Sequence, residues 1–232
     1  MNATLYLLPT PLSEEDPIPL TAPYNISVIH DCKNFVVEEL RTARRFLKAI
    51  DKSINIDELT FHELNEHTPE TDLVNIFKSV TENEKTILMS EAGCPGVADP
   101  GAALVKLAHK HNVKVIPLIG PSSILMAIMA AGFNGQSFAF NGYLPKEKTE
   151  RSKKIKELEK LSHRQPQWFI ETPYRNMQLL DELVSSVSPE TKICLAANIT
   201  AANEFIQTKK AIDWKKNKPD LNKVPCVFGI GQ

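Results

Sequence analysis

Residues 86–101, T-I-L-M-S-E-A-G-C-P-G-V-A-D-P-G, are the stretch that decides the fold. They begin with the apolar run 86–89, which is typical of a buried strand, and continue into a turn rich in glycine and proline. A helical pattern follows at 102–109 and a second apolar run at 113–119. Strand, glycine loop, helix and strand form the βαβ unit of a parallel sheet. Because ligands bind beyond the carboxyl ends of such strands, we expect this loop to line a ligand site.

The chemistry of the loop limits the classes of ligand that it is expected to bind. Its glycines allow a positive φ and let a ligand approach the main chain closely. Asp99 stands before Pro100, a pattern that predicts a helix N-cap followed by proline at the first helical position. A role for Asp99 at the ligand site is equally consistent with the pattern. The loop matches neither G-x-G-x-x-G nor G-x-x-x-x-G-K-[ST], so neither a dinucleotide nor a nucleoside triphosphate is predicted.

The composition is that of an ordinary globular protein with room for one large or two small domains. Of 232 residues, 42% are hydrophobic and 24% charged, and the net charge is −1. This charge provides no global basic field for nucleic-acid binding, although it leaves room for a local basic face. Four widely spaced cysteines without a C-x-x-C pair predict neither a zinc site nor a disulfide framework.

The chain carries no pattern for export or membrane insertion. Residues 1–11 lack the charged segment of a signal peptide, and the apolar helix predicted at 124–131 is too short to span a bilayer. With the reduced cysteines, these features predict a soluble, cytoplasmic protein that does not bind membranes.

Strand and helix patterns alternate along the whole chain, which predicts the α/β class. We expect two α/β domains, residues 1–120 with the glycine loop and a smaller domain at 121–232. The other predicted strands are 4–8, 34–37, 61–64, 137–141, 168–171, 193–197 and 224–230. Met126 and Met129 are expected in the core, and the lysine-rich residues before 224 are expected to form a surface segment.

Two helical patterns carry basic residues. The pattern at 38–47 has an apolar face, Glu38 and Glu39 near its start, and Arg41 and Arg44 mostly off that face. The pattern at 146–161 holds seven Lys or Arg against four Glu. A solvated surface is the simpler interpretation of both helices, and 146–161 is the one locally basic element that the sequence predicts.

Six motifs in collinear order resemble one family. The motifs are L-Y-L-L-P-T-P (5–11), V-E-E-L-R-T-A-R-R-F-L (37–47), S-E-A-G-C-P-G-V-A-D-P-G (90–101), I-P-L-I-G-P-S-S (116–123), F-A-F-N-G-Y-L-P (138–145) and F-I-E-T-P-Y-R (169–175). With them the chain is similar to the tetrapyrrole methylase superfamily of S-adenosylmethionine-dependent methyltransferases. Within that superfamily it resembles most the ribosomal RNA small subunit methyltransferase I group, which methylates a ribose 2′-oxygen of 16S rRNA.

The resemblance implies two α/β domains with S-adenosylmethionine in the cleft between them, in a homodimer that acts on 16S rRNA or the small ribosomal subunit. It places Glu38, Glu39, Arg41 and Arg44 beside the acceptor, with the arginines positioning phosphates, and it identifies no general base and no metal. The cofactor contacts that it implies are Pro9, Glu91, Ala92, Gly93, Cys94, Pro95, Ser122, Ser123, Thr172, Pro173, Ala196, Asn198 and Pro225.

The chain departs from the family pattern at three places. The turn after the first strand usually reads T-P-x-G-N, whereas Thr10-Pro11 is followed here by Leu12-Ser13-Glu14. Glu91 stands where the family usually has Asp. The family segment A-R-E-L-T-K-x-H-E aligns with 196–204, A-A-N-I-T-A-A-N-E, in which the Arg, the first Glu, the Lys and the His are replaced. These losses keep two alternatives open. The same fold could methylate a small molecule such as a tetrapyrrole, or the protein could bind the cofactor without catalysis.

Overall fold

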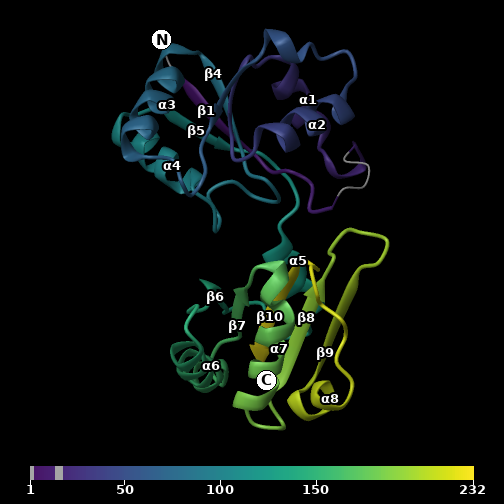
Figure 1. Ribbon diagram of the computed structural model, residues 1–232. Coiled ribbons are helices and arrows are strands. Elements are labelled where there is room, and N and C mark those ends of the chain that lie inside the picture. Colours follow the sequence, from purple (N-terminus) through teal and green to yellow (C-terminus); the bar gives the residue numbers. More distant parts are fainter. Residues whose placement is uncertain (1–2, 14–17) are drawn as a thin grey trace. The chain divides into compact units, whose positions relative to one another are not determined.

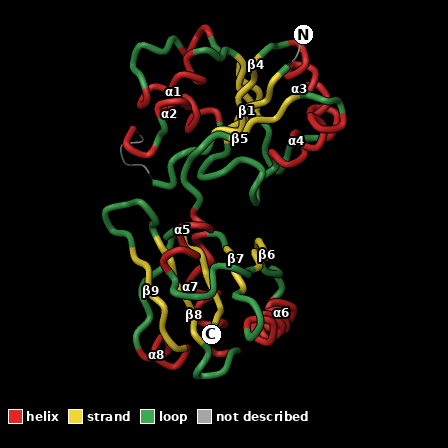
Figure 2. The backbone as a smooth tube through the Cα atoms, turned by 180° about the vertical axis from the view of Figure 1, so that it is seen from behind, coloured by secondary structure: helices red, strands yellow, loops and turns green. Residues whose placement is uncertain are grey.

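The structure is a computed structural model that describes residues 3–13 and 18–232. The chain divides into two compact units, Met1–Ser122 and Ser123–Gln232 (Figures 1 and 2). Each unit has its own sheet and its own core. The predicted α/β class is confirmed.

The first unit is built on a five-stranded parallel sheet with the strand order β3-β2-β4-β1-β5. The strands are β1 (Thr4–Leu8), β2 (Asn34–Val37), β3 (Thr60–Glu63), β4 (Lys85–Met89) and β5 (Lys114–Pro117). Short apolar runs form these central strands because both faces of a parallel sheet are covered by helices. In β2, for example, all four residues are buried.

Helices cover both faces of this sheet (Figure 1). Phe35 and Val37 pack in one core cluster with the helices α1 (Pro23–His30) and α2 (Leu40–Ile50). Val36 packs in another with α3 (Glu70–Glu82) and α4 (Gly101–Lys110). Alternate strand residues therefore face opposite layers, as the pleat requires. Two 3₁₀ turns, Ile18–Leu20 and Ile56–Glu58, complete the regular structure described in this unit.

The second unit has a mixed sheet with the order β6-β7-β10-β8-β9. Only β6 and β7 are parallel, and the other neighbours are antiparallel. The strands are β6 (Ala139–Tyr143), β7 (Gln167–Ile170), β8 (Lys192–Ala197), β9 (Phe205–Lys210) and β10 (Cys226–Gly231). The helices are α5 (Ser123–Ala130), α6 (Lys148–Ser162), the 3₁₀ helix η3 (Pro173–Arg175), α7 (Asn176–Ser186) and α8 (Ala211–Lys216).

The central strand β10 packs tightly on both sides. Phe228 lies in the core with residues of α6, α7 and α8. Gly229 faces the buried Trp168, and a Cβ at Gly229 would lie 2.6 Å from the indole ring. Gly231 similarly faces Phe133, and a Cβ at Gly231 would lie 2.6 Å from the phenyl ring. Glycine is needed at both positions because an aromatic ring occupies the space of a side chain.

One expectation needs correction, and two elements were not predicted. β9 and α8 belong to the region of the lysine-rich surface segment. An edge strand pairs on one side only, so β9 tolerates the polar residues of F-I-Q-T-K-K, which hid it in the sequence. Met129 is 83% exposed and Met126 is partly exposed, so the prediction of a core position is wrong for Met129. Helix α5 is apolar all round, and its sequence therefore could not indicate its buried face.

Among the helices that the structure describes, none is both long and apolar enough to cross a membrane.

Candidate functional site

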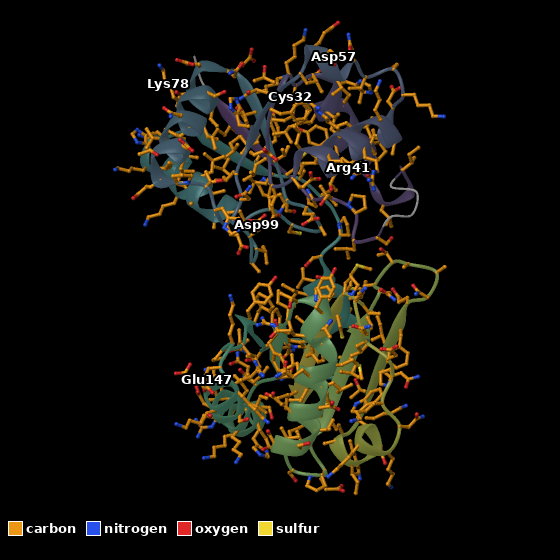
Figure 3. The ribbon with its side chains drawn as sticks, viewed as in Figure 1. Cys32, Arg41, Asp57, Lys78, Asp99 and Glu147 are labelled. Atoms are coloured by element: carbon orange, nitrogen blue, oxygen red, sulfur yellow. The ribbon has the colours of Figure 1, made fainter. Side chains whose placement is uncertain are left out.

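In the first unit, the carboxyl ends of all five strands lie at one side of the sheet because the strands are parallel. The loops after β1, β2, β4 and β5, residues 9–13, 38–39, 90–101 and 118–122, are called the first edge below. Asp99 and Arg41, both labelled in Figure 3, belong to the glycine loop and to the start of α2. This edge holds the site residues predicted in the first unit except Arg41 and Arg44, which lie on α2 directly after it.

The glycine loop is tied to the end of β1 by main-chain hydrogen bonds. The Thr10 N–H donates to the Gly93 carbonyl over 2.9 Å, and the Gly93 N–H donates to the Thr10 carbonyl over 3.1 Å. The Ser90 hydroxyl donates to the same Gly93 carbonyl over 2.9 Å. Gly93 has φ +79°, and an added Cβ would lie 3.2 Å from the Leu12 side chain. The turn therefore requires glycine, and Gly93 itself is buried.

Asp99 fixes the second half of the loop. Its Oδ1 accepts the N–H groups of Gly96 (2.6 Å) and Gly101 (2.9 Å). The cap position of α4 is Pro100 rather than Asp99, so the predicted cap is displaced by one residue, although the carboxylate does satisfy the first helical N–H. Burial raises the pKa of the Asp99 carboxyl, against the opposing effect of the two N–H donors. The structure thus supports a structural role for Asp99.

The carboxylates of Glu38 and Glu39 bind different parts of the first unit. The Glu38 Oε2 accepts the Glu91 N–H over 2.9 Å, which brings the end of β2 to the glycine loop. Partial burial, followed by the charges of Glu38 and Glu39, raises the pKa of the Glu91 carboxyl. Glu39 caps α2 through the Arg41 N–H (2.9 Å) and the Thr42 hydroxyl (2.6 Å), and these bonds lower its pKa. Glu38 therefore faces the loop, whereas Glu39 is committed to the helix.

Arg41 and Arg44 are both exposed on α2. The Arg44 guanidinium lies 5.3 Å from the centre of the Phe61 ring, a cation–π contact that holds it beside β3. Arg41 makes no ion pair with any residue in 3–13 or 18–232. Of the two arginines, Arg41 has the freer charge.

The loop after β5 packs against the other two loops. A Cβ at Gly120 would lie 2.4 Å from the Pro9 Cβ, so the Gly120 main chain packs directly against the Pro9 ring. The Cys94 thiol donates to the Pro121 carbonyl over 3.4 Å and is hydrogen-bonded to the Ser122 hydroxyl. Burial raises the pKa of this thiol. These contacts bring together the predicted cofactor residues Pro9, Glu91, Ala92, Gly93, Cys94, Pro95 and Ser122. Ser123 begins α5 in the second unit.

In the second unit, three predicted segments also meet at one side of the sheet. β10 is antiparallel to β7 and β8, so its start lies beside their ends. The residues around these ends, 171–175, 196–200 and 223–225, are called the second edge below. The Asn198 N–H donates to the Pro225 carbonyl over 3.0 Å, and the Lys223 N–H donates to the Pro173 carbonyl over 3.1 Å. Thr172 is the second residue after β7 and is half-buried.

The backbone of this edge is unusual. Asn198 has φ +49° and Thr200 has φ +74°, the left-handed region that β-branched residues rarely adopt. Ala196 lies inside the sheet, paired with Val227 and Ile206, and is only 1% exposed. Any contact of Ala196 with a ligand would therefore involve its main chain.

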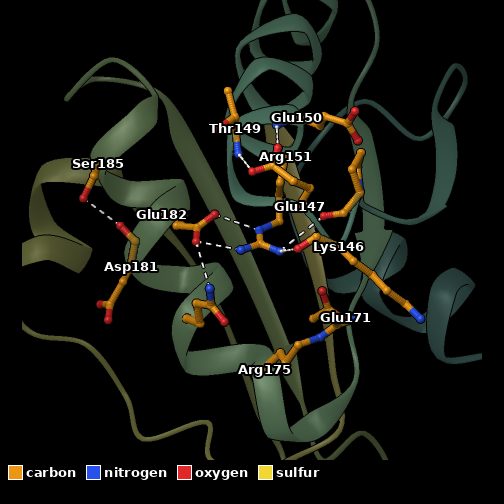
Figure 4. A network of polar contacts seen from close by, with 12 residues as sticks. Lys146, Glu147, Thr149, Glu150, Arg151, Glu171, Arg175, Asp181, Glu182 and Ser185 are labelled. Carbon is orange, nitrogen blue, oxygen red and sulfur yellow. Dashed lines mark hydrogen bonds and ion pairs between the residues drawn. The ribbon is translucent and has the colours of Figure 1, made fainter.

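Buried ion pairs, which the sequence analysis missed, hold the loops of the second unit. In Figure 4 the Arg151 guanidinium forms two parallel bonds to Glu182, both 2.7 Å. It also donates to the carbonyls of Pro145 (3.2 Å) and Lys146 (2.8 Å), so it fixes the loop between β6 and α6. The side chains of Arg151 and Glu182 are 3% and 10% exposed, and the pairing lowers the pKa of Glu182. The only sequence signal is the position of Arg151, in register with the buried Ile155 and Leu158 of α6.

A second ion pair lies in the turn after β7. The buried Glu171 accepts the Arg175 guanidinium over 2.5 Å and the Thr172 N–H over 2.7 Å. Together these bonds fix the turn that carries Thr172 and Pro173.

The comparisons with known proteins identify the family. No family model matches the chain. A ribosomal RNA small subunit methyltransferase I of Vibrio cholerae is 30% identical over 203 residues, which cover 88% of this chain and 67% of that protein. The chain belongs to this family. The protein of the same name from Halalkalibacterium halodurans is 27% identical over 218 residues, 93% of this chain and 72% of that protein.

Solved structures agree on the fold. The methyltransferase CobJ matches with a TM-score of 0.65 and 18% identity, over 99% of this chain and 93% of that chain. Uroporphyrin-III C-methyltransferase from Thermus thermophilus, in complex with S-adenosylhomocysteine, matches with a TM-score of 0.61 and 12% identity, over 99% and 97%. The fold is thus that of the tetrapyrrole methylases, as predicted. Family membership makes the protein a methyltransferase enzyme that uses S-adenosylmethionine.

Proposed function

We propose that the protein methylates a ribose 2′-oxygen of the small-subunit ribosomal RNA. The name of the relatives supports this acceptor. The observation on this chain that carries the proposal is a stripe of exposed basic side chains along α6 and just beyond its C-terminus, which the near-neutral net charge conceals. The same fold acting on a tetrapyrrole has no comparable support from a residue of this chain.

The basic stripe consists of Lys153, Lys156, Lys160 and Arg164. These residues recur at intervals of three and four, are all exposed, and lie opposite the buried residues of α6. Within the described ranges none of the four makes an ion pair.

The acidic residues of α6 are mostly engaged elsewhere. Glu157 pairs with Lys154 at 3.0 Å. Glu159 accepts the Ser188 N–H (2.6 Å) and the Thr191 hydroxyl (2.5 Å). The stripe therefore keeps its positive charge, and successive phosphates of an RNA strand have the chemistry to neutralise it.

The first edge fits S-adenosylmethionine as a chemical partner. No hydrogen-bond acceptor is found, among the residues described, for the main-chain N–H groups of Ala92 and Cys94. These donors suit the carboxylate of the cofactor, and the exposed Glu91 carboxylate suits its hydroxyl or ammonium groups. The other proposed cofactor contacts rest on the family resemblance. They are Pro9, Gly93, Pro95, Ser122 and Ser123, together with Thr172, Pro173, Ala196, Asn198 and Pro225 of the second unit.

Bound S-adenosylmethionine supplies an activated sulfonium methyl group, so the protein has to position the acceptor oxygen and exclude water. Glu38 is the proposed proton acceptor for the ribose hydroxyl because Glu39 is committed to capping α2. Arg41, exposed and unpaired among the described residues, would hold a neighbouring phosphate.

We also propose that the protein forms a homodimer, as the family resemblance implies. Leu125 and Met129 lie one turn apart on α5 and are 53% and 83% exposed. Two large apolar side chains on one exposed helix face suit a contact with a second copy. Analytical ultracentrifugation would measure the mass, and a monomer at micromolar concentration would contradict this part of the proposal.

The test of the acceptor uses purified small-subunit RNA and isotopically labelled S-adenosylmethionine. We expect label on a ribose 2′-oxygen and RNA binding that weakens with salt. In Lys156→Gln/Lys160→Gln the slope of log affinity against log salt should fall by roughly 0.7–0.9 per lost phosphate contact.

The matched control is Lys106→Gln/Lys110→Gln, which removes two exposed lysines with the same spacing on α4 and should leave the slope unchanged. Label in a tetrapyrrole but not in RNA would favour the small-molecule alternative. Cofactor binding without transfer to either acceptor would favour a non-catalytic protein.

A further inference from the structure

Tyr174, in the η3 turn of the second edge, is 75% exposed. Exposure alone means little, because single exposed aromatic residues are common on protein surfaces. Tyr24 on α1, for example, is 59% exposed. What distinguishes Tyr174 is the structure that holds it.

The turn around Tyr174 is fixed on both sides. Before it, the buried Glu171 binds the Thr172 N–H and the Arg175 guanidinium. After it, the fully buried Asn176 donates its side-chain N–H to the Val224 carbonyl over 2.6 Å. With three hydrogen bonds from groups within residues 172–176, the exposed ring stands on a rigid base.

The segment before β10 is clamped to the same turn. The Lys223 N–H donates to the Pro173 carbonyl over 3.1 Å, and Lys223 has φ +61°. A lysine in the left-handed region is strained, and such strain persists only where the surroundings impose it. This conformation places the Lys223 ammonium 5.8 Å from the centre of the Tyr174 ring. The result is a preorganised aromatic surface with a positive charge beside it.

We propose that Tyr174 is a stacking platform for an unpaired nucleobase of the RNA acceptor, with Lys223 contacting the adjacent phosphate. The inference rests on the proposed RNA substrate. An exposed aromatic ring beside a cation is the pair that single-stranded nucleic acids use, since every base has a π face and every linkage a negative charge. A purely structural tyrosine would be packed into the core instead of standing on a clamped turn.

A nucleobase of the RNA acceptor is favoured over the adenine of the cofactor as the group that stacks on Tyr174. Thr172 and Pro173, the proposed cofactor contacts of this turn, are half-buried, whereas the ring of Tyr174 extends into solvent. A surface that is open to this extent suits a large partner. Binding to the cofactor is a separate outcome of the test.

The experiment compares Tyr174→Ala, Tyr174→Phe and the control Tyr24→Ala in the full chain. The readouts are binding of a single-stranded small-subunit RNA fragment by fluorescence anisotropy, KM and kcat for RNA methylation, and calorimetric affinity for S-adenosylhomocysteine. Tyr174→Ala should weaken RNA binding and raise KM about tenfold or more while leaving cofactor affinity unchanged. Tyr174→Phe and Tyr24→Ala should stay within about twofold of the unmodified protein, and Lys223→Gln should lower the salt slope by about one.

The outcomes separate this inference from the proposed function. Normal RNA binding and KM in Tyr174→Ala, with methylation intact, would overturn the inference and leave the function standing. If RNA binding depends on Tyr174 but the RNA is never methylated, the proposed function would be overturned and the stacking role of Tyr174 would stand. Loss of S-adenosylhomocysteine affinity in Tyr174→Ala would assign the ring to the cofactor and overturn the inference, as would a full chain that binds no RNA.

Discussion

In the first unit the loops at the sheet edge are held mainly by main-chain hydrogen bonds and glycine geometry, whereas the loops of the second unit are also held by buried ion pairs. Gly93 and Thr10 exchange two backbone bonds, and Gly120 packs directly on Pro9. In the second unit, Arg151 binds Glu182 and two loop carbonyls. The first edge is therefore sensitive to an added atom, and the loops of the second unit are sensitive to a removed charge.

The difference extends to pH. At the first edge burial and neighbouring carboxylates raise the pKa of Glu91, whereas in the second unit an arginine lowers the pKa of Glu182. Two groups of the same type thus affect stability in opposite directions. The three predictions below use these differences, from the largest effect to the smallest.

Glu182→Ala should cause the largest loss of stability. It leaves the Arg151 charge buried without a partner, which typically costs about 3–5 kcal/mol. Thermal or urea unfolding of the full chain measures the loss. The control Glu157→Ala removes the exposed pair with Lys154 from α6 and should cost about 1 kcal/mol or less. Equal losses in the two variants would show that the buried pair does not hold the loop.

Gly120→Ala should have an intermediate effect in the first unit. The new Cβ would lie 2.4 Å from the Pro9 Cβ, so one of the two loops must move. Overpacking of this kind costs about 1–3 kcal/mol, and we expect weaker binding of S-adenosylmethionine in calorimetric titration. Gly135→Ala is the control because nothing lies within 4 Å of its added Cβ. Unchanged stability and cofactor affinity in Gly120→Ala would contradict the close packing of the first edge.

The smallest effect is the opposite pH dependence of Glu91→Gln and Glu182→Gln. Glu91 has a raised folded pKa, so its charge destabilises the fold at neutral pH and the penalty disappears as the pH falls through that raised value. Glu91→Gln should therefore raise Tm at neutral pH, with a gain that vanishes below the usual pKa of glutamate.

Glu182 has a lowered folded pKa, so it contributes stability above the usual pKa of glutamate that is lost as the pH falls through the lowered value. Glu182→Gln should lower Tm at neutral pH and lower it progressively less in acid. Melting curves measured from neutral pH to acid test the direction of the Tm change in both variants, and Glu84→Gln serves as an exposed control. Parallel pH profiles for the two variants would refute the comparison.

Much of the fold was readable from local patterns. β1 and β2 were predicted with their observed bounds, because short apolar runs between turn signals suffice to mark buried parallel strands. β9 was missed because an edge strand needs no apolar alternation, and the exposure of Met129 was missed because α5 has no polar face to orient it.

The site was readable only in part. The sequence located the glycine loop and the turn after β7, since both follow strands. It could not show that Arg151 pairs with Glu182, which are 31 positions apart, or that Lys223 lies over Tyr174. Such pairs depend on tertiary packing, which no local pattern encodes. The assignment of individual cofactor contacts stays a prediction.

The place of β10 in the second sheet has a consequence for synthesis of the protein. The strands of the first sheet all precede residue 118, so the first unit can fold while the ribosome is still extending the chain. In the second unit, β7 and β8 are separated until β10, residues 226–231, inserts between them. Until those residues have left the ribosomal exit tunnel, the nascent second unit keeps two strands with open edges and needs protection from aggregation.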